Sequence, residues 1–342
     1  MDTVPIAFWE HMCDVLDGTL WEVGKLSGNL GKFALLHNAG YEAEVANGVE
    51  RNAHLFYMGR TMKTLEEFEA VPKKRVRRVS IQLFDDEEEN VTRSLSKRFP
   101  RAVFDFFLES PSINEALVDV VCSLKRLGSI SLTTELDDHA VSLFQKIVAS
   151  RKISELTIDQ SAGEGDTLEV TKSILCQDQF KELEVSSGWL GEESDESDES
   201  DVVLELLEFW SENSKELIGK SLTLNGDNCE CGVRQLEEFL LHRAPGRSEL
   251  KDVLKMCSQE ECDFIFKEYP RNRANFTNSS AVYKFEEGDG CERRRLYVSF
   301  ECGAGKLGGT PLRPANHSKV NDLSLIRKTH SLRVLFAVSG SV

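Results

Sequence analysis

The chain has 342 residues, 40% of them hydrophobic and 29% charged, so it can bury one or two substantial cores without disulfides or metals. A formal charge of −17 disfavours nucleic acid and anionic membrane as partners, and no apolar run approaches the roughly 18 residues of a spanning helix. The first residues lack the basic and apolar regions of a signal peptide. We therefore expect an intracellular protein with nine reduced cysteines, in the cytoplasm or alternatively in the nucleus.

The first 45 residues are expected to form a small helical segment. Two short helices are predicted, with a break between them at Asp17-Gly18. Their start and apolar positions are Pro5, Phe8, Met12, Leu16, Leu20, Val23 and Leu26. Helices this short cannot form a stable core alone, so they must pack on the rest of the chain, on a partner, or on both.

This stretch resembles the F-box, a helical motif that binds the Skp1 adaptor of cullin-based ubiquitin ligases. Val4-Pro5 stands where the family has Leu-Pro, and Met12-Cys13 and Leu16 match apolar positions of its first helix. The whole chain also resembles members of the expanded nematode F-box-like families. The resemblance implies that a Skp1-like adaptor binds the seven start and apolar positions named above. The alternative is a helical cap that only shields the apolar edge of the adjoining segment of the chain.

Residues 46–245 repeat one pattern, a short strand followed by an amphipathic helix. Similar strand phrases centre on Ser131, Thr157, Glu184 and Thr223, at spacings of 26, 27 and 39 residues. The longest interval contains an acidic, serine-rich loop at 188–201, and without eleven of its residues the interval is 28. The period extends back to strands at 104–106, 81–83 and 55–57. Helical patterns lie at 110–128, 137–150, 166–177, 201–213 and 232–243.

This period resembles that of leucine-rich repeats, whose units bury their faces only against their neighbours. It predicts an α/β fold: a short leucine-rich-repeat-like solenoid between the N-terminal helical cap and a C-terminal α+β cap. The strands near residues 131, 157, 184 and 223 should be adjacent, parallel and in that order. The alternative is an ordinary α/β domain with parallel strands.

The polar side chains of these strands form the candidate partner-binding surface. Apolar neighbours point into the core, so the residues between and beside them line the opposite, concave face. The predicted partner-binding residues are Glu155, Thr157, Asp159, Glu182, Glu184, Thr223 and Asn225. Acids gather in this set and no base is present, so we expect a protein target that presents lysine or arginine side chains.

Residues 246–342 break the period. Helices are predicted within 248–269, and a β-hairpin within 281–302 around a Gly-Asp-Gly turn. A loop rich in glycine and proline follows at 303–322, and one more strand at 331–338. This segment is expected to cap the open end of the solenoid or to form a small α+β appendage.

No motif points to catalysis, a metal or a cofactor. Residues 303–310 lack the spacing of a phosphate-binding loop, and the cysteines lack that of a zinc site, so we interpret most of them as buried small hydrophobes. We therefore expect a non-enzymatic protein-interaction module, a substrate-recruiting adaptor of a Skp1-cullin-type ubiquitin ligase. The alternative is a binding scaffold with no ubiquitin-ligase link.

Two charged runs allow two interpretations each. The basic run 72–78 predicts an exposed loop between repeats, with a nuclear import signal as the alternative. The acidic run 192–200 predicts a solvated loop, with phosphorylation of Ser194, Ser197 and Ser200 as the alternative.

Overall fold

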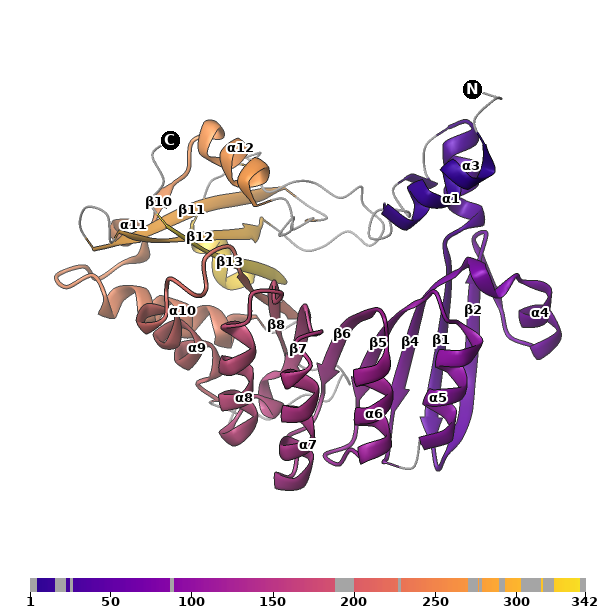
Figure 1. Ribbon diagram of the computed structural model, residues 1–342. Coiled ribbons are helices and arrows are strands. Elements are labelled where there is room, and N and C mark those ends of the chain that lie inside the picture. Colours follow the sequence, from indigo (N-terminus) through magenta and orange to yellow (C-terminus); the bar gives the residue numbers. More distant parts are fainter. Residues whose placement is uncertain are drawn as a thin grey trace. The chain divides into compact units, whose positions relative to one another are not determined.

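The computed structural model describes residues 5–15, 23–24, 27–86, 89–187, 200–226, 229–269, 276, 279–288, 293–302, 315 and 323–338. These residues form a mixed α/β protein in which strands and helices alternate through the middle of the chain (Figure 1). The chain divides into two compact units, Met1–Ser131 with Leu136–Lys152 (unit 1) and Leu132–Glu135 with Ile153–Val342 (unit 2). The boundaries expected at 45 and 245 each fall inside a unit. Among the described helices, none has the length and apolar character that crossing a bilayer requires.

The described strands of unit 1 follow the order β3-β2-β1-β4-β5-β6. Their bounds are β1 (Ala39–Ala46), β2 (Val49–Tyr57), β3 (Arg60–Met62), β4 (Val76–Leu83), β5 (Val103–Leu108) and β6 (Leu127–Leu132). The helices of this unit are α1 (Ile6–Val15), α3 (Asn29–Leu36), α4 (Leu65–Ala70), η2 (Lys73–Arg75), α5 (Glu89–Arg98), α6 (Glu115–Ser123) and α7 (Asp138–Ala149). β4 pairs parallel with β1 on one side and with β5 on the other. Figure 1 shows α5 and α6 on one face of these strands.

Unit 1 begins its sheet with a hairpin that the repeat period did not predict. β1 and β2 pair antiparallel across Asn47 and Gly48, whose φ values of 53° and 66° suit a tight two-residue turn. The strand expected at 55–57 exists as part of β2, but its expected parallel direction is wrong. Residues 39–46 form β1. Of these, residues 39–45 were expected to belong to the helical segment and residue 46 to begin the solenoid. The Asn-Gly pair is the sequence signal that indicates this hairpin.

Unit 2 contains three of the repeated strands, β7 (Glu155–Asp159), β8 (Glu182–Ser187) and β9 (Ser221–Gly226). Both pairings are parallel, and their register makes Thr157, Glu184 and Thr223 direct neighbours. The predicted adjacency, direction and order are therefore confirmed for these three strands. The strand predicted near residue 131 is β6, which follows β5 in the order of unit 1. The five predicted helices are α6, α7, α8 (Gly165–Leu175), α9 (Val202–Glu212) and α10 (Glu230–His242), with a short η3 (Gln160–Ala162) after β7.

Lysine side chains that precede the strands donate hydrogen bonds to backbone carbonyls at the ends of helices that come earlier in the sequence. Lys220, directly before β9, donates from Nζ to the carbonyl oxygens of Gln177, at 3.0 Å, and of Leu175. In unit 1, Lys152 donates in the same way to the carbonyl oxygen of Leu124, at 2.7 Å. The last carbonyls of a helix have no partner within the helix. These cations therefore satisfy acceptors that would otherwise be left unpaired inside the fold.

The C-terminal part of unit 2 continues the sheet with antiparallel strands. After β9 the order is β13 (Ser331–Val338), β12 (Arg294–Glu301), β11 (Ser280–Glu287) and β10 (Lys255–Met256). The helices of this part are α11 (Leu250–Val253), α12 (Gln259–Glu268) and η6 (Leu323–Lys328). The predicted hairpin and the predicted last strand are confirmed. The last strand lies between β9 and β12, so it pairs directly with the parallel strands.

The core of unit 2 forms where β13 meets the helices. Trp210 of α9 is fully buried, and its ring stacks on Phe336 of β13 at a centroid distance of 5.8 Å. Phe239 of α10 meets the same indole edge-on at 6.2 Å. These aromatic contacts pack β13 against α9 and α10.

Candidate functional site

The seven predicted partner-binding residues lie on one face of the unit 2 sheet. Side chains alternate between the two faces of a strand, and the intervening Leu156, Ile158, Leu183, Val185, Leu222 and Leu224 are buried. The register aligns the polar residues in three rows across the strands. The rows are Glu155, Glu182 and Ser221; Thr157, Glu184 and Thr223; and Asp159, Ser186 and Asn225. We call this surface the acidic face.

The predicted residues differ in how well a partner could reach them. Glu155 and Asn225 are exposed, while Thr157, Asp159, Glu182 and Glu184 are half-buried. Thr223 is only 9% exposed, and its hydroxyl donates to Glu182 Oε1 at 2.7 Å. Thr223 is therefore nearly buried, and its hydroxyl supports Glu182.

Arg333 belongs to this site, although the sequence pattern did not select it. β13 pairs antiparallel with β9, and Arg333 lies opposite Thr223. Its Nη2 donates to Ser221 Oγ at 2.8 Å and lies 3.3 Å from Glu182 Oε2. Burial lowers the pKa of Arg333, while the carboxylates of Glu182 and Glu155 act in the opposite direction. The sequence signal that could have indicated Arg333 is an arginine within the otherwise apolar strand 331–338. The residues it contacts could not be predicted without knowing the order of the strands.

The electrostatics of the acidic face favour a cationic partner. Burial raises the pKa of Glu184, and the nearby carboxylates of Glu182 and Glu155 raise it further. Asn225 opposes this effect by donating from Nδ2 to Glu184 Oε1 at 3.3 Å. A cation placed over the three carboxylates would relieve their mutual repulsion. The face is therefore suited to a lysine or arginine side chain of another protein.

The predicted adaptor-binding residues lie in unit 1. Phe8, on α1, is 48% exposed, Pro5 is exposed, and Met12 is half-buried. Val23 is half-buried and packs with Phe33 against the buried Ala34. The predicted Leu16, Leu20 and Leu26 lie outside the described residues.

The two N-terminal helices contact each other through aromatic rings. Trp9 of α1 lies 6.2 Å from Phe33 of α3, measured between ring centroids, and Phe33 stacks on His37 at 4.3 Å. Phe8 touches Trp9 edge-on at 5.5 Å while about half of its own surface remains exposed. The helix pair thus turns Trp9 inward and Phe8 outward.

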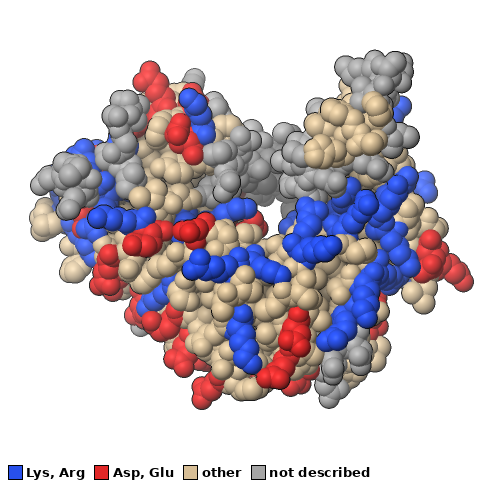
Figure 2. Space-filling view, viewed as in Figure 1, with Lys and Arg blue, Asp and Glu red and all other residues tan. Residues whose placement is uncertain are grey.

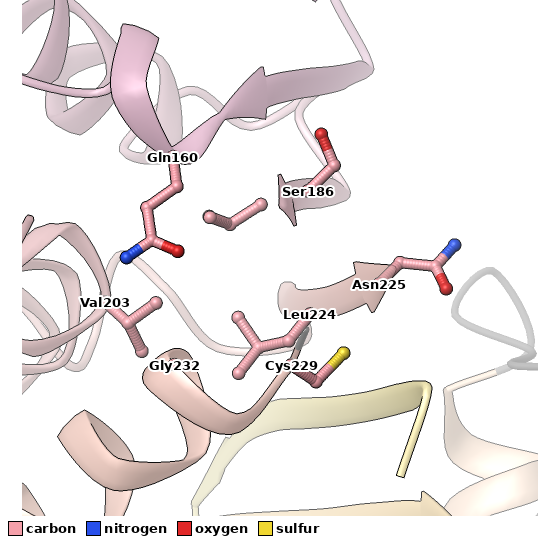
Figure 3. Close-up of a pocket in the computed structure, with 8 residues that line it drawn as sticks. Gln160, Ser186, Val203, Leu224, Asn225, Cys229 and Gly232 are labelled. Atoms are coloured by element: carbon pink, nitrogen blue, oxygen red, sulfur yellow. The ribbon is translucent and has the colours of Figure 1, made fainter. Parts of the chain in front are cut away.

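A small cavity lies at the carboxyl ends of β7, β8 and β9 (Figure 3). It is lined by Gln160, Val185, Ser186, Val203, Leu224, Asn225, Cys229 and Gly232. Its volume is about 10 Å³, no more than one water molecule needs. In Figure 3 the Asn225 side chain points away from this space. The cavity is too small for an organic ligand.

Hydrogen bonds join two residues that line this cavity, Gln160 and Val203, to Ser200 and Gln235. Gln160 donates from Nε2 to the carbonyl oxygen of Ser200 at 3.2 Å, and Ser200 Oγ donates back to the Gln160 carbonyl at 3.3 Å. Gln235 Oε1 accepts from the Val203 amide at 2.9 Å. Ser200 is buried, so its hydroxyl is not placed for phosphorylation. Ser194 and Ser197 lie outside the described residues, as do residues 303–310.

Within the part of the chain that the structure describes, no three or more His, Cys, Asp or Glu side chains come together as a metal site. Seven cysteines whose side chains the structure describes take part in no disulfide. Cys229, Cys257 and Cys262 are buried, and burial raises the pKa of the Cys257 thiol well above its usual range. A raised thiol pKa lowers the thiolate fraction, and with it the nucleophilicity. Compared with known proteins, the chain matches no family model, no curated protein and no solved structure.

Proposed function

We propose that the protein is a non-enzymatic interaction module that recruits a substrate to a Skp1-cullin-type ubiquitin ligase. In this proposal α1 contacts a Skp1-like adaptor, and the acidic face of unit 2 holds a basic target protein. The observation that carries the adaptor assignment is the outward position of Phe8 beside the inward-facing Trp9. Phe8 lies on the helix that resembles the first helix of the F-box, so its exposed ring is accessible to an adaptor.

The proposed architecture is a leucine-rich-repeat-like solenoid with an F-box-like N-terminal segment. The parallel, in-register pairing of β7, β8 and β9, with α8 and α9 between them in sequence, supports this description. Such repeats present their strand face as an extended binding surface. The acidic face occupies that position, and its clustered carboxylates suit lysine or arginine side chains.

Phe8→Asp tests the adaptor contact. Apolar anchors at the centre of an interface commonly contribute about 2 kcal/mol or more, so we expect at least a tenfold loss of affinity for a purified Skp1-like adaptor. Leu65→Asp is the matched control, because Leu65 is 68% exposed on α4 of the same unit. Equal adaptor binding by wild type and Phe8→Asp, or none by the wild type, would favour the alternative of a scaffold with no ubiquitin-ligase link.

Charge reversal on the acidic face tests the target contact. From the sequence alone, one would choose to replace Asp159, Glu182 and Glu184 together by lysine. In the structure, however, Glu182→Lys would place a cation against the buried Arg333. Glu155→Lys with Asp159→Lys leaves the contact between Glu182 and Arg333 in place. We expect slower association with captured targets and unchanged adaptor binding, because complementary charge mainly affects the association rate. Glu208→Lys with Glu212→Lys, both exposed on α9, is the control with the same net charge.

A further inference from the structure

Unit 1 carries a concentration of positive charge that contrasts with the chain's net charge of −17. Twelve of the 41 lysines and arginines lie in four short segments, 72–78, 97–101, 124–127 and 150–152, which contain no acid. Three of these segments lead into β4, β5 and β6, and the fourth follows α7. We call their surface the basic edge. The twelve residues are Lys73, Lys74, Arg75, Arg77, Arg78, Lys97, Arg98, Arg101, Lys125, Arg126, Arg151 and Lys152.

The fold of unit 1 brings these segments to one edge of its sheet. β4 and β5 are parallel, so they begin at the same edge, and Arg78 pairs in register with Val103. Arg126 donates from Nη1 to the carbonyl oxygen of Arg101 at 3.3 Å. Lys152 reaches back to the carbonyl oxygen of Leu124 at 2.7 Å. Figure 2 shows lysines and arginines gathered along the edge where Figure 1 draws the starts of β4 and β5.

Structural roles account for only part of this charge. Cations stabilise helix C-termini, and α5 ends within one of these segments while α6 and α7 end directly before two others, but each terminus carries only about half an elementary charge. Ion pairs between described residues at the edge include Asp105 with Arg78 at 2.6 Å, Glu50 with Arg98 at 3.8 Å, and Glu69 with Lys73 at 4.0 Å. Seven cations of the edge are exposed: Lys73, Lys74, Arg78, Lys97, Arg101, Lys125 and Arg151. The edge therefore presents several positive side chains to solvent.

The basic run 72–78 is part of this edge and is folded. Its first cations form η2, while Arg77 is buried at the start of β4. Arg75 donates to the Tyr57 hydroxyl, and its guanidinium lies 5.9 Å from the centre of that ring. The run is therefore held in place by the fold, so the edge offers a fixed array of charges.

We propose that the basic edge binds an acidic peptide segment of a partner protein. Neighbouring strands lie about 4.8 Å apart, so the starts of three strands span about 10 Å, which three or four extended residues cover. Proteins that bind single-stranded nucleic acid stack bases on exposed aromatic rings. The one aromatic residue of the four segments, Phe99, is only 3% exposed. A short acidic peptide needs only the local positive field, since salt screens more distant charges beyond about 8 Å. This inference does not depend on the proposed function.

The test is fluorescence anisotropy with a dye-labelled peptide of about ten alternating glutamate and serine residues, which exceeds the estimated span. The edge variant combines Lys97→Glu, Arg101→Glu and Lys125→Glu. The control combines Lys32→Glu, Arg51→Glu and Lys63→Glu, three exposed cations of unit 1 outside the edge. Both variants change the net charge equally. We expect the edge variant to bind at least about tenfold more weakly, the control to bind within about twofold of the wild type, and added salt to weaken wild-type binding.

Four results would overturn the proposal. One is no peptide binding by the wild-type protein, and another is an equal loss in both variants. The third is tighter binding, through the same edge residues, of a single-stranded oligonucleotide or of anionic phospholipid vesicles. If circular dichroism shows that the edge variant is unfolded, the corresponding glutamine substitutions replace the charge reversals. Retained peptide binding by that folded, neutralised variant would also overturn the proposal.

Discussion

Replacing Arg333 by methionine removes a buried guanidinium and leaves an unbranched side chain in its place. Nη2 of Arg333 lies 2.8 Å from Ser221 Oγ and 3.3 Å from Glu182 Oε2. Only 7% of the Arg333 side chain is exposed, against 27% of that of Glu182. In the variant, the fully buried Ser221 hydroxyl therefore loses a charged hydrogen-bond donor, and the half-buried Glu182 carboxylate loses its counterion.

The size of the effect follows from these two losses. Removing one partner of a buried ion pair costs about 3–5 kcal/mol when the other charge is left uncompensated. Glu182 still accepts from the Thr223 hydroxyl and is partly hydrated, which reduces this cost. A hydrogen bond to a charged group contributes about 1.5–3 kcal/mol. We therefore expect the free energy of unfolding of unit 2 to fall by about 2–3 kcal/mol.

Urea unfolding, followed by circular dichroism and tryptophan fluorescence, measures this change. Trp210 reports on the region because its ring stacks on Phe336 of β13. Lys251→Met is the matched control, since Lys251 pairs with Glu249 in the same unit and their side chains are 68% and 59% exposed. Exposed ion pairs contribute about 1 kcal/mol or less.

Measuring the same substitution in a second protein, the Glu182→Gln variant, separates the contribution of the ion pair from that of side-chain packing. In Glu182→Gln protein, Arg333→Met should cost at least about 1 kcal/mol less than in the wild type, because the two residues are in contact. An equal cost in both backgrounds would refute the role assigned to this pair. So would a loss no larger than that of Lys251→Met.

The raised pKa of Glu184 means that the folded state holds this proton more tightly than the unfolded state, so its stabilising contribution is lost as pH rises. Glu184→Gln should therefore raise the urea midpoint of unfolding at neutral pH and leave it nearly unchanged below about pH 4. A gain that is the same at every pH would contradict this. Gly128→Ala should lower the free energy of unfolding by about 1–3 kcal/mol, because the added Cβ would lie 2.3 Å from the buried carboxylate of Asp105; an unchanged melting temperature would refute the close approach. Hydrogen bonds from Ser112 and from the amides at the start of α7 lower the pKa of Asp137, so its carboxylate stabilises the fold above its unfolded-state pKa and this contribution is lost as pH falls. Asp137→Asn should lower the melting temperature at neutral pH, with the difference closing in acid; a constant difference across the pH series would speak against a charge effect.

Spacing in the amino-acid sequence was sufficient to locate the repeated strands β4 to β9 and the helices α6 to α9 between them, whereas α5 was not predicted. Thr157, Glu184 and Thr223 were predicted as neighbours and are neighbours in register. Alternation along each strand also placed the acids on one face, because side chains of a strand point alternately to its two sides. These features depend on local pattern, so they can be read without knowing which distant segments meet.

Only the tertiary structure decided how the ends of the chain join the parallel strands. β13 lies beside β9 and brings Arg333 under Glu182, residues separated by 151 positions. β2 turns back on β1, which makes the strand at 55–57 antiparallel. In the strand pattern alone, Thr223 is equivalent to Thr157, yet its place beside Arg333 buries it while Thr157 stays half-exposed. The physical reason is that a strand's pattern specifies its faces, whereas its partner and direction depend on which edge is open and which pairing buries the most apolar surface.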